Sequence, residues 1–214
     1  MKALLHTLFA LFLAVTPALS QKDVKAEQIL NELSKKYKNF KTIKADFRYI
    51  LEMKSDDFKE EQTGTIYLKN DMFKLSFGDQ MIMSDNVNMW TYLKDVNEVQ
   101  VDKYRPDDME IKPNELFMIY DKDFLYRFVE EKKEGDRTLQ VIELTPNNKE
   151  ESYFKIKISI DKNKKELVRT VIYEKSGNLY TYEITSFTPN VSLDESFFRF
   201  ETQKHPGVTV VDLR

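Results

Sequence analysis

The chain has 214 residues and carries 33 Lys and Arg against 36 Asp and Glu, which gives a formal net charge of −3. Positive and negative residues are interspersed, and this argues against a nucleic-acid partner, whose usual footprint is a basic stripe or a high pI. The chain contains no Cys, so a disulfide, a thiolate nucleophile and a thiolate metal ligand are all excluded.

The first twenty residues have the pattern of an export signal. Lys2 supplies a positive start, residues 4–15 form a short apolar run, and Ala18-Leu19-Ser20 precedes Gln21. Small residues at the two positions that a signal peptidase reads predict cleavage near Ser20/Gln21. The apolar run is too short to span a bilayer. We therefore expect residues 1–20 to be a signal peptide and residues 21–214 to form one exported domain.

An amphipathic helix is predicted at the start of this domain. Residues 24–40 carry apolar side chains at spacings of three and four, and Asp23 stands where an N-cap is expected. One face of the helix must therefore pack against a partner. The apolar stripe consists of Ile29, Leu30, Leu33, Tyr37 and Phe40.

Period-two alternation begins directly after this helix and indicates half-buried strands. Apolar and polar residues alternate over residues 43–54, and the runs 73–77, 154–160 and 180–184 fit the same pattern. Turn-forming residues separate these runs. About ten short strands with tight connections predict an antiparallel meander, and a long antiparallel sheet must curl, split into layers or close.

A second helical region is predicted in the middle of the chain, over residues 113–129. Pro113 suits a first helical position, and Glu115 lies in the first turn. Ten apolar residues follow, at positions 116–120, 124–126 and 128–129, interrupted by the polar residues 121–123. We expect two short helices that cover an apolar surface of the sheet like a lid.

The concave face of such a sheet has two interpretations. It can hold only the core of the protein, packed to ordinary density. Aromatic residues make up 13% of the chain and are accompanied by eight Met, and these residue types line surfaces that accept varied apolar ligands. The single Trp, Trp90, follows a hairpin at residues 84–89 and is explained equally well as a core residue.

The sequence offers little support for a catalytic site or a metal site. His205 is the only imidazole outside the export signal, and it lies in a turn-like segment where a solvated loop is the simpler interpretation. Neither a Gly-x-Ser-x-Gly elbow nor a histidine-rich zinc motif is present. We predict no catalytic residue, no metal and no cofactor.

The chain resembles the periplasmic outer-membrane lipoprotein carrier family, LolA, over nearly its whole exported length. The matching segments occur in the family's order, behind an export signal without a lipidation cysteine. They are Ile43 to Phe47, Gly64 to Lys69 with Phe73, Ser84-Asp85 through Trp90-Thr91-Tyr92, Pro113 to Tyr120, and Phe198-Arg199-Phe200 with Pro206 to Asp212.

This resemblance implies an α+β fold with a strongly curved antiparallel half-barrel of about eleven strands. An N-terminal helix and a central helical lid would enclose an apolar cavity. The implied function is periplasmic carriage of acylated lipoproteins by a monomer. An inner-membrane ABC transporter would supply the lipoprotein, and an outer-membrane lipoprotein receptor would accept it.

Alternation and resemblance together place a set of side chains in the lipid-binding cavity. The set consists of Phe47, Tyr49, Tyr67, Phe73, Leu75, Trp90, Tyr92, Leu116, Phe117 and Tyr120. The family also has an Arg-Pro pair after its second strand, where the Arg holds the lid shut. Here Lys69, Asn70 and Asp71 occupy that position, so the latch is absent as written. Lys69, Arg48 and Arg105 are candidate substitutes.

Two other functions remain open on the sequence. A lipid-binding or envelope-stress sensor module of the same fold is the alternative to carriage, because a fold does not fix a function. A hydrolase is the third possibility, since Asp, Glu and Ser are plentiful. The acidic pairs Glu130-Glu131 and Glu150-Glu151 lie in polar stretches, where a solvated loop is favoured over a catalytic dyad.

Overall fold

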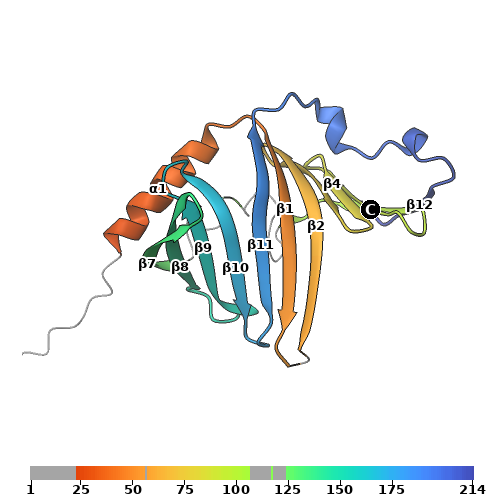
Figure 1. Cartoon of the computed structure of the whole chain (residues 1–214). Helices are drawn as coiled ribbons and strands as arrows, with labels where there is room; N and C mark the ends of the chain where they lie inside the picture. Colours follow the sequence, from red (N-terminus) through yellow and green to blue (C-terminus); the bar gives the residue numbers. More distant parts are fainter. Residues whose placement is uncertain (1–22, 56, 107–116, 118–123) are drawn as a thin grey trace, which may run out of the picture.

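The structure is a computed structural model that describes residues 23–55, 57–106, 117 and 124–214. In these residues one α-helix accompanies a single curved sheet of twelve strands (Figure 1). The strand order across the sheet is β12-β6-β5-β4-β3-β2-β1-β11-β10-β9-β8-β7. The elements are α1 (Val24–Lys38), β1 (Ile43–Met53), β2 (Phe58–Lys69), β3 (Met72–Phe77), β4 (Gln80–Ser84), β5 (Asn88–Leu93), β6 (Glu98–Lys103), β7 (Phe124–Glu134), β8 (Arg137–Pro146), β9 (Tyr153–Asp161), β10 (Glu166–Glu174), β11 (Leu179–Pro189), η3 (Glu195–Phe198), η4 (Thr202–Lys204) and β12 (Thr209–Asp212).

The two faces of the sheet follow from the alternation of side chains along each strand. We call the face that carries α1 and the main core the inner face, and the opposite one the outer face. In β1 the odd-numbered residues Ile43, Ala45 and Phe47 are buried on the inner face. The register of β1 with β2 aligns Phe47 with Gly64, and a shift between Asp46 and Phe47 marks a bulge in the pairing with β11.

The N-terminal helix forms as predicted, although it ends at Lys38 rather than at Phe40. Its buried residues Leu30, Leu33 and Tyr37 belong to the same core as the inner-face residues of β1. Figure 1 shows α1 flanking the β7–β10 part of the sheet, while the tall strands β1, β2 and β11 form its centre. The helix therefore covers only one part of the inner face.

Asp23 ties the start of the helix to the edge of the sheet. Its Oδ1 accepts a hydrogen bond from the Ala26 N–H at 3.0 Å, and its Oδ2 accepts one from the Phe128 N–H of β7 at 2.8 Å. These backbone bonds, first that of Ala26 and then that of Phe128, hold the pKa of Asp23 below its ordinary value of 3.8. The Asp23 carboxylate thus caps α1 and also accepts a hydrogen bond from a backbone N–H of the edge strand β7.

The prediction of a helix over residues 113–129 is wrong for residues 124–129. Residues 124–129 form the first half of β7, which pairs with β8 from Phe124↔Pro146 onward. Phe124, Tyr126 and Phe128 alternate and pack against the main core, which is the behaviour of a strand. Residues 113–116 and 118–123 of the predicted lid lie outside the described residues, as does the predicted signal peptide.

Two further differences concern the sheet as a whole. It has twelve strands rather than about eleven, and β12 pairs with β6 in parallel, so the sheet is not wholly antiparallel. In the part of the chain that is described, no helix is long and apolar enough to cross a membrane. The family resemblance thus predicted the curved sheet, and the helix predicted from the residue pattern is wrong over 124–129.

We predict that Asp23→Ala lowers the free energy of unfolding by about 1 to 2 kcal/mol, because both the helix cap and the bond to β7 are lost. Asp95→Ala, at an exposed turn, is the matched control. Because the pKa of Asp23 is lowered on folding, its charge stabilises the protein above pH 4, and this contribution disappears as the pH falls through the folded pKa. Urea unfolding at pH 7 and pH 3 measures both effects, and an equal loss in the two variants contradicts the prediction.

Candidate functional site

A wall of aromatic rings lines the centre of the inner face. Tyr49 lies 5.1 Å from Phe77, 5.4 Å from Tyr182 and 6.2 Å from Tyr180, measured between ring centroids. Phe47 extends the wall at 6.2 Å from Phe77 and 6.3 Å from Tyr182. Except for Phe47, these rings are only half-buried. Because they come from β1, β3 and β11, the curvature of the sheet brings them together.

Gly64 makes room for this wall. It lies opposite Phe47 in the register of β1 and β2, and a Cβ at this position would overlap Cζ of the Phe47 ring and come within 2.8 Å of the Ser76 carbonyl oxygen. The absence of a side chain at Gly64 therefore lets the Phe47 ring lie flat against β2. Any other residue at this position would displace the ring or the strand.

Phe117 packs on the inner face next to the C-terminal end of α1. Its ring stacks on Tyr37 of α1 at 5.6 Å and lies 6.3 Å from Phe187, and the residue is 2% exposed. Burial raises the pKa of Tyr37, whose hydroxyl oxygen accepts a hydrogen bond from the Leu167 N–H at 3.1 Å. Burial also raises the pKa of Tyr49 to about 12, so both phenols are neutral at any physiological pH.

Two cavities meet at Phe117. The first is apolar and holds about 20 Å³, with walls formed by Phe47, Ile66, Phe117, Leu167, Thr170, Tyr182 and Ile184. The second, which we call the rim pocket, holds about 240 Å³ between the end of α1 and the β2–β3 turn. Its walls are Tyr37, Lys38, Phe40, Lys41, Thr42, Ile43, Leu68, Asn70, Asp71 and Phe117.

Five of the predicted cavity residues lie where they were expected. Phe47, Tyr49, Phe73 and Leu75 are on the inner face, and Phe117 packs in the same core. Phe73 is fully buried and also contacts Tyr104 at 6.0 Å, so it is a core residue rather than an open wall. The two remaining lid residues, Leu116 and Tyr120, lie outside the described residues.

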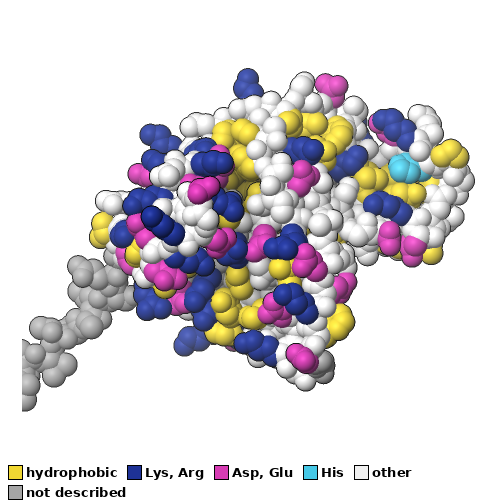
Figure 2. Space-filling model, in the orientation of Figure 1, with side chains coloured by type: hydrophobic (Ala, Val, Ile, Leu, Met, Phe, Trp, Pro, Cys, Tyr) yellow, Lys and Arg dark blue, Asp and Glu magenta, His cyan; other side chains and the backbone are white. Residues whose placement is uncertain are grey.

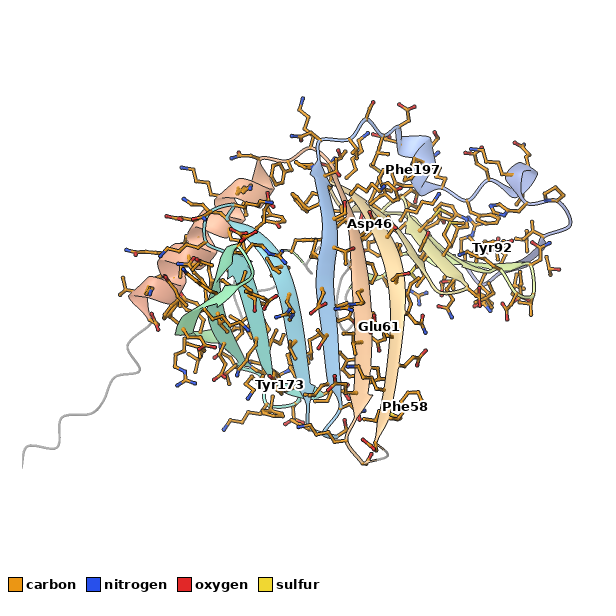
Figure 3. The ribbon with its side chains drawn as sticks, viewed as in Figure 1. Asp46, Phe58, Glu61, Tyr92, Tyr173 and Phe197 are labelled. Atoms are coloured by element: carbon orange, nitrogen blue, oxygen red, sulfur yellow. The ribbon has the colours of Figure 1, made fainter. Side chains whose placement is uncertain are left out.

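Three of the predicted cavity residues lie on the opposite face. Tyr67 is on the outer face of β2 and its ring meets Phe197 of η3 at 4.9 Å. Trp90 and Tyr92 align with Met83 and Met81 of β4, and they pack in a second core on the outer face. Figure 3 shows Tyr92 and Phe197 with the charged outer-face residues Asp46 and Glu61 on the same side of the sheet.

The C-terminal segment, residues 190–214, covers this second core. Phe200 and Val208 pack against Met83, Tyr92 and Val99. His205, which was expected in a solvated loop, is half-buried, with its ring 4.5 Å from both Tyr92 and Phe200. The imidazole is therefore part of an aromatic cluster.

The candidate latch residues Lys69, Arg48 and Asn70 lie in different places: two are on the outer face and one lines the rim pocket. Lys69 points to the outer side, where its Nζ donates a hydrogen bond to the Leu193 carbonyl at 2.9 Å and so holds the C-terminal segment. Arg48 is also on the outer face and binds Glu183 and Glu61. Asn70, in a left-handed turn with φ of 52°, lines the rim pocket. Lys69 and Arg48 therefore lie on the opposite face of the sheet from Phe117.

Charged side chains of both signs are spread over the outer face between smaller apolar patches (Figure 2). Burial works against ionisation of Glu183, but hydrogen bonds from Arg48 and Arg169 hold its pKa below the ordinary value. Arg169 in turn binds Glu134 at 3.0 Å. No group of three or more His, Asp or Glu in the described ranges could hold a metal ion. The inner face is thus the surface suited to an apolar ligand.

Sequence reasoning missed the rings of Phe77, Tyr180, Tyr182 and Tyr37 as site residues. The first three were recognisable, since they lie in runs whose alternation was read correctly. The fourth, Tyr37, was assigned to the helix stripe, which gave no indication that it contacts Phe117 across the core.

Comparisons with known proteins agree with this geometry. A family model described as outer membrane lipoprotein carrier protein LolA matches residues 38–201. A comparison with curated protein sequences finds no match.

Solved structures that resemble this chain share little sequence with it. An uncharacterized conserved protein from Thermus thermophilus has a TM-score of 0.58 at 14% identity, over 88% of this chain and 99% of that one. LprF from Mycobacterium bovis has a TM-score of 0.50 at 12% identity, over 79% and 96%. A LolA superfamily protein from Nitrosomonas europaea has a TM-score of 0.44 at 12% identity, over 82% and 97%.

The placement of Trp90 gives a direct spectroscopic test. We predict that Phe200→Ala shifts the emission of Trp90, the only Trp, to longer wavelength and lowers the free energy of unfolding by about 3 kcal/mol, because the outer core loses a buried ring. Phe58→Ala, at the far end of β2 and 44% exposed, should change neither. An unchanged Trp90 spectrum in Phe200→Ala would place Trp90 away from this core.

Proposed function

The chain belongs to the LolA family of outer membrane lipoprotein carrier proteins, and we propose that it binds the acyl chains of lipoproteins on its inner face and carries them across the periplasm. In this proposal residues 1–20 are a cleaved export signal, and the protein is a carrier without enzymatic activity. The observation that carries the proposal is the half-buried aromatic wall on the face that α1 leaves partly uncovered.

The energetic demand on such a carrier is large. Each CH₂ exposed to water costs about 0.8 kcal/mol, so a chain of roughly fourteen CH₂ groups carries a cost of about 11 kcal/mol. The carrier must offset most of this cost and still release the chain. Flat aromatic rings supply large apolar area with few rotatable bonds, and they impose little specificity on the shape of the chain.

The apolar cavity of about 20 Å³ is far too small for an acyl chain. Binding therefore requires inner-face side chains to move. Phe117 is suited to this, because it separates the two cavities and its partners Tyr37 and Phe187 can keep their contacts with Phe40 when the Phe117 ring leaves. The half-buried rings of Tyr49, Tyr180 and Tyr182 then provide a surface that is already partly open.

The partners in this proposal follow from the family rather than from a contact in this structure. An inner-membrane ABC transporter would release the lipoprotein to this chain, and an outer-membrane receptor would take it. The protein acts as a monomer in this scheme, with one cargo molecule on its inner face.

Identification of the native cargo tests the function directly. The protein is purified from envelope extracts without detergent, and bound molecules are analysed by mass spectrometry. We expect acylated lipoproteins in stoichiometric amounts. Bound phospholipid without lipoprotein would contradict carriage and favour a lipid-binding or sensor module of the same fold.

A pair of matched variants tests the site. We predict that Tyr182→Asp weakens binding of a neutral fluorescent acyl probe by at least tenfold, because it places a carboxylate where the chain should lie. Tyr173→Asp makes the same change at a half-buried Tyr of β10 that lies on the outer face beside Lys155, and it should change the affinity by less than twofold. Similar losses in both variants, measured by titration, would contradict an inner-face site.

A further inference from the structure

One buried hydroxyl on the inner face has no hydrogen-bond partner. Thr170 of β10 is 3% exposed, and its backbone pairs with Ile158 of β9 and with Tyr182 of β11. Within the described part of the chain, the Thr170 hydroxyl neither donates nor accepts a hydrogen bond. A buried hydroxyl in this state costs stability, so its presence in the core needs an explanation.

The hydroxyl belongs to the wall of the apolar cavity beside Phe117. Thr170 lies on the inner face, two residues before Ile172 of the main core. Tyr182, which also lines the cavity, is half-buried, and its ring is part of the aromatic wall. The other lining residues have no polar side-chain atom: Phe47, Ile66, Phe117, Leu167 and Ile184. Thr170 therefore supplies a buried hydrogen-bonding group to a cavity that is otherwise apolar.

The size of the cavity limits what can meet this hydroxyl. Its volume of about 20 Å³ is far below that of an acyl chain but is sufficient for one group of about the size of a water molecule. A carbonyl oxygen is of this size, and it can accept a hydrogen bond from a hydroxyl. A ligand can therefore place one polar atom beside Thr170 while its chain lies elsewhere.

The aromatic wall leads to this place. Phe47 and Tyr182 belong both to the wall and to the cavity, so a chain that lies along the rings from Tyr49 reaches the cavity with one of its ends. A terminal methyl group there would leave the Thr170 hydroxyl unpaired, whereas a carbonyl would satisfy it. On the other side of Phe117 lies the rim pocket, with the exposed Lys41 in its wall, so that groups joined to the carbonyl can extend toward water when the Phe117 ring moves.

We propose that the Thr170 hydroxyl donates a hydrogen bond to the carbonyl oxygen of the ester or amide that joins an acyl chain to the rest of the ligand. The inference rests on the proposed function, since it requires a chain along the aromatic wall. It adds a direction to that binding: the carbonyl lies beside β10, and the hydrocarbon runs toward Tyr49. Thr170 is thus a specificity-determining residue in a surface that otherwise recognises only apolar area.

The test compares three neutral probes that share a nine-carbon chain. Methyl decanoate carries an ester carbonyl, N-methyldecanamide carries an amide carbonyl, and 2-methyl-1-undecene carries a CH₂ group in place of the carbonyl oxygen. Each displaces a neutral naphthylamine reporter from the purified protein in a fixed concentration of cyclodextrin, which keeps the probes dissolved. The quantity measured is the ratio of carbonyl-probe affinity to alkene affinity. Probe hydration and cyclodextrin binding cancel when this ratio is compared between variants.

Thr170→Val removes the hydroxyl and keeps the size of the side chain. We expect it to lower the ratio by about three- to tenfold for the better carbonyl probe, the range of one neutral hydrogen bond, and to leave alkene binding unchanged. Thr170→Ser should keep most of the preference. Thr181→Val makes the same change on the outer face of β11 and should keep all of it. The order of methyl decanoate and N-methyldecanamide shows whether an ester or an amide is recognised.

The stability of the empty protein gives a second readout. We expect Thr170→Val to raise the midpoint of urea unfolding, because an unpartnered buried hydroxyl is replaced by a methyl group. Thr42→Val is the matched comparison: Thr42 is also buried, but its hydroxyl donates a hydrogen bond to the Val191 carbonyl at 2.6 Å. This variant should lower the midpoint.

The failure of this inference is distinct from the failure of the proposed function. Equal affinity ratios in the native protein and in Thr170→Val, or a midpoint that Thr170→Val lowers as Thr42→Val does, overturn the role of Thr170 and leave acyl-chain binding intact. A native protein that binds none of the three probes overturns the proposed function itself, and this inference with it.

Discussion

A sheet of twelve strands has two faces, and one fifteen-residue helix cannot cover even one of them. This constraint governs the rest of the molecule. The helix buries the β7–β10 part of the inner face, the C-terminal segment buries the β4–β6 part of the outer face, and neither reaches the centre of the inner face. The rings of Tyr49, Tyr180 and Tyr182 lie in that centre. They are only half-buried because no described element packs over them. Among the described residues this aromatic surface is only partly covered, and this supports the proposal that it binds a ligand.

The helix α1 and the C-terminal segment, which each cover part of one face, are attached by contacts that lie away from the proposed binding surface. Asp23 and the buried face of α1 hold the helix against β7, while Lys69 and the pairing of β12 with β6 hold the C-terminal segment. Neither set of contacts involves the rings around Tyr49. Side chains there can therefore move to admit a ligand without loosening either attachment. A rearrangement at Phe117 would break its ring contacts with Tyr37 and Phe187 and its packing in the main core.

The sequence predicted the strands well and the faces only in part, for a physical reason. Alternation in residues 43–53 places Phe47 and Tyr49 on one face, but parity has no meaning across a hairpin unless the turn length and register are known. The prediction for Tyr67 is wrong because its pairing with Lys44 turns it outward. The predictions for Trp90 and Tyr92 are wrong because three more hairpins, β2–β3, β3–β4 and β4–β5, intervene. The family resemblance located these segments along the chain without specifying their orientation. Residues 124–129 failed differently: the helix was predicted from Pro113 and from the apolar content of the run, whereas Phe124, Tyr126 and Phe128 at alternate positions fit a strand.

The wrong placement of Trp90 on the inner face is linked to a second failure, since the sequence also did not predict the outer core. Met81, Met83, Tyr92 and Val99 are contributed by three short strands, and their cover comes from Phe200 and Val208, a hundred residues later. Sequence alone offers no sign that a terminal segment returns to an earlier hairpin, because the contact depends on the course of residues 190–208 over the edge of the sheet. Once that course is known, the function of each face follows from what lies on it. The outer face of β4–β6 is closed by the chain itself, and the outer face of β10 and β11 is charged around Glu183. Among the described residues the inner face is apolar and incompletely covered, and this supports the proposal that it is the surface that binds a ligand.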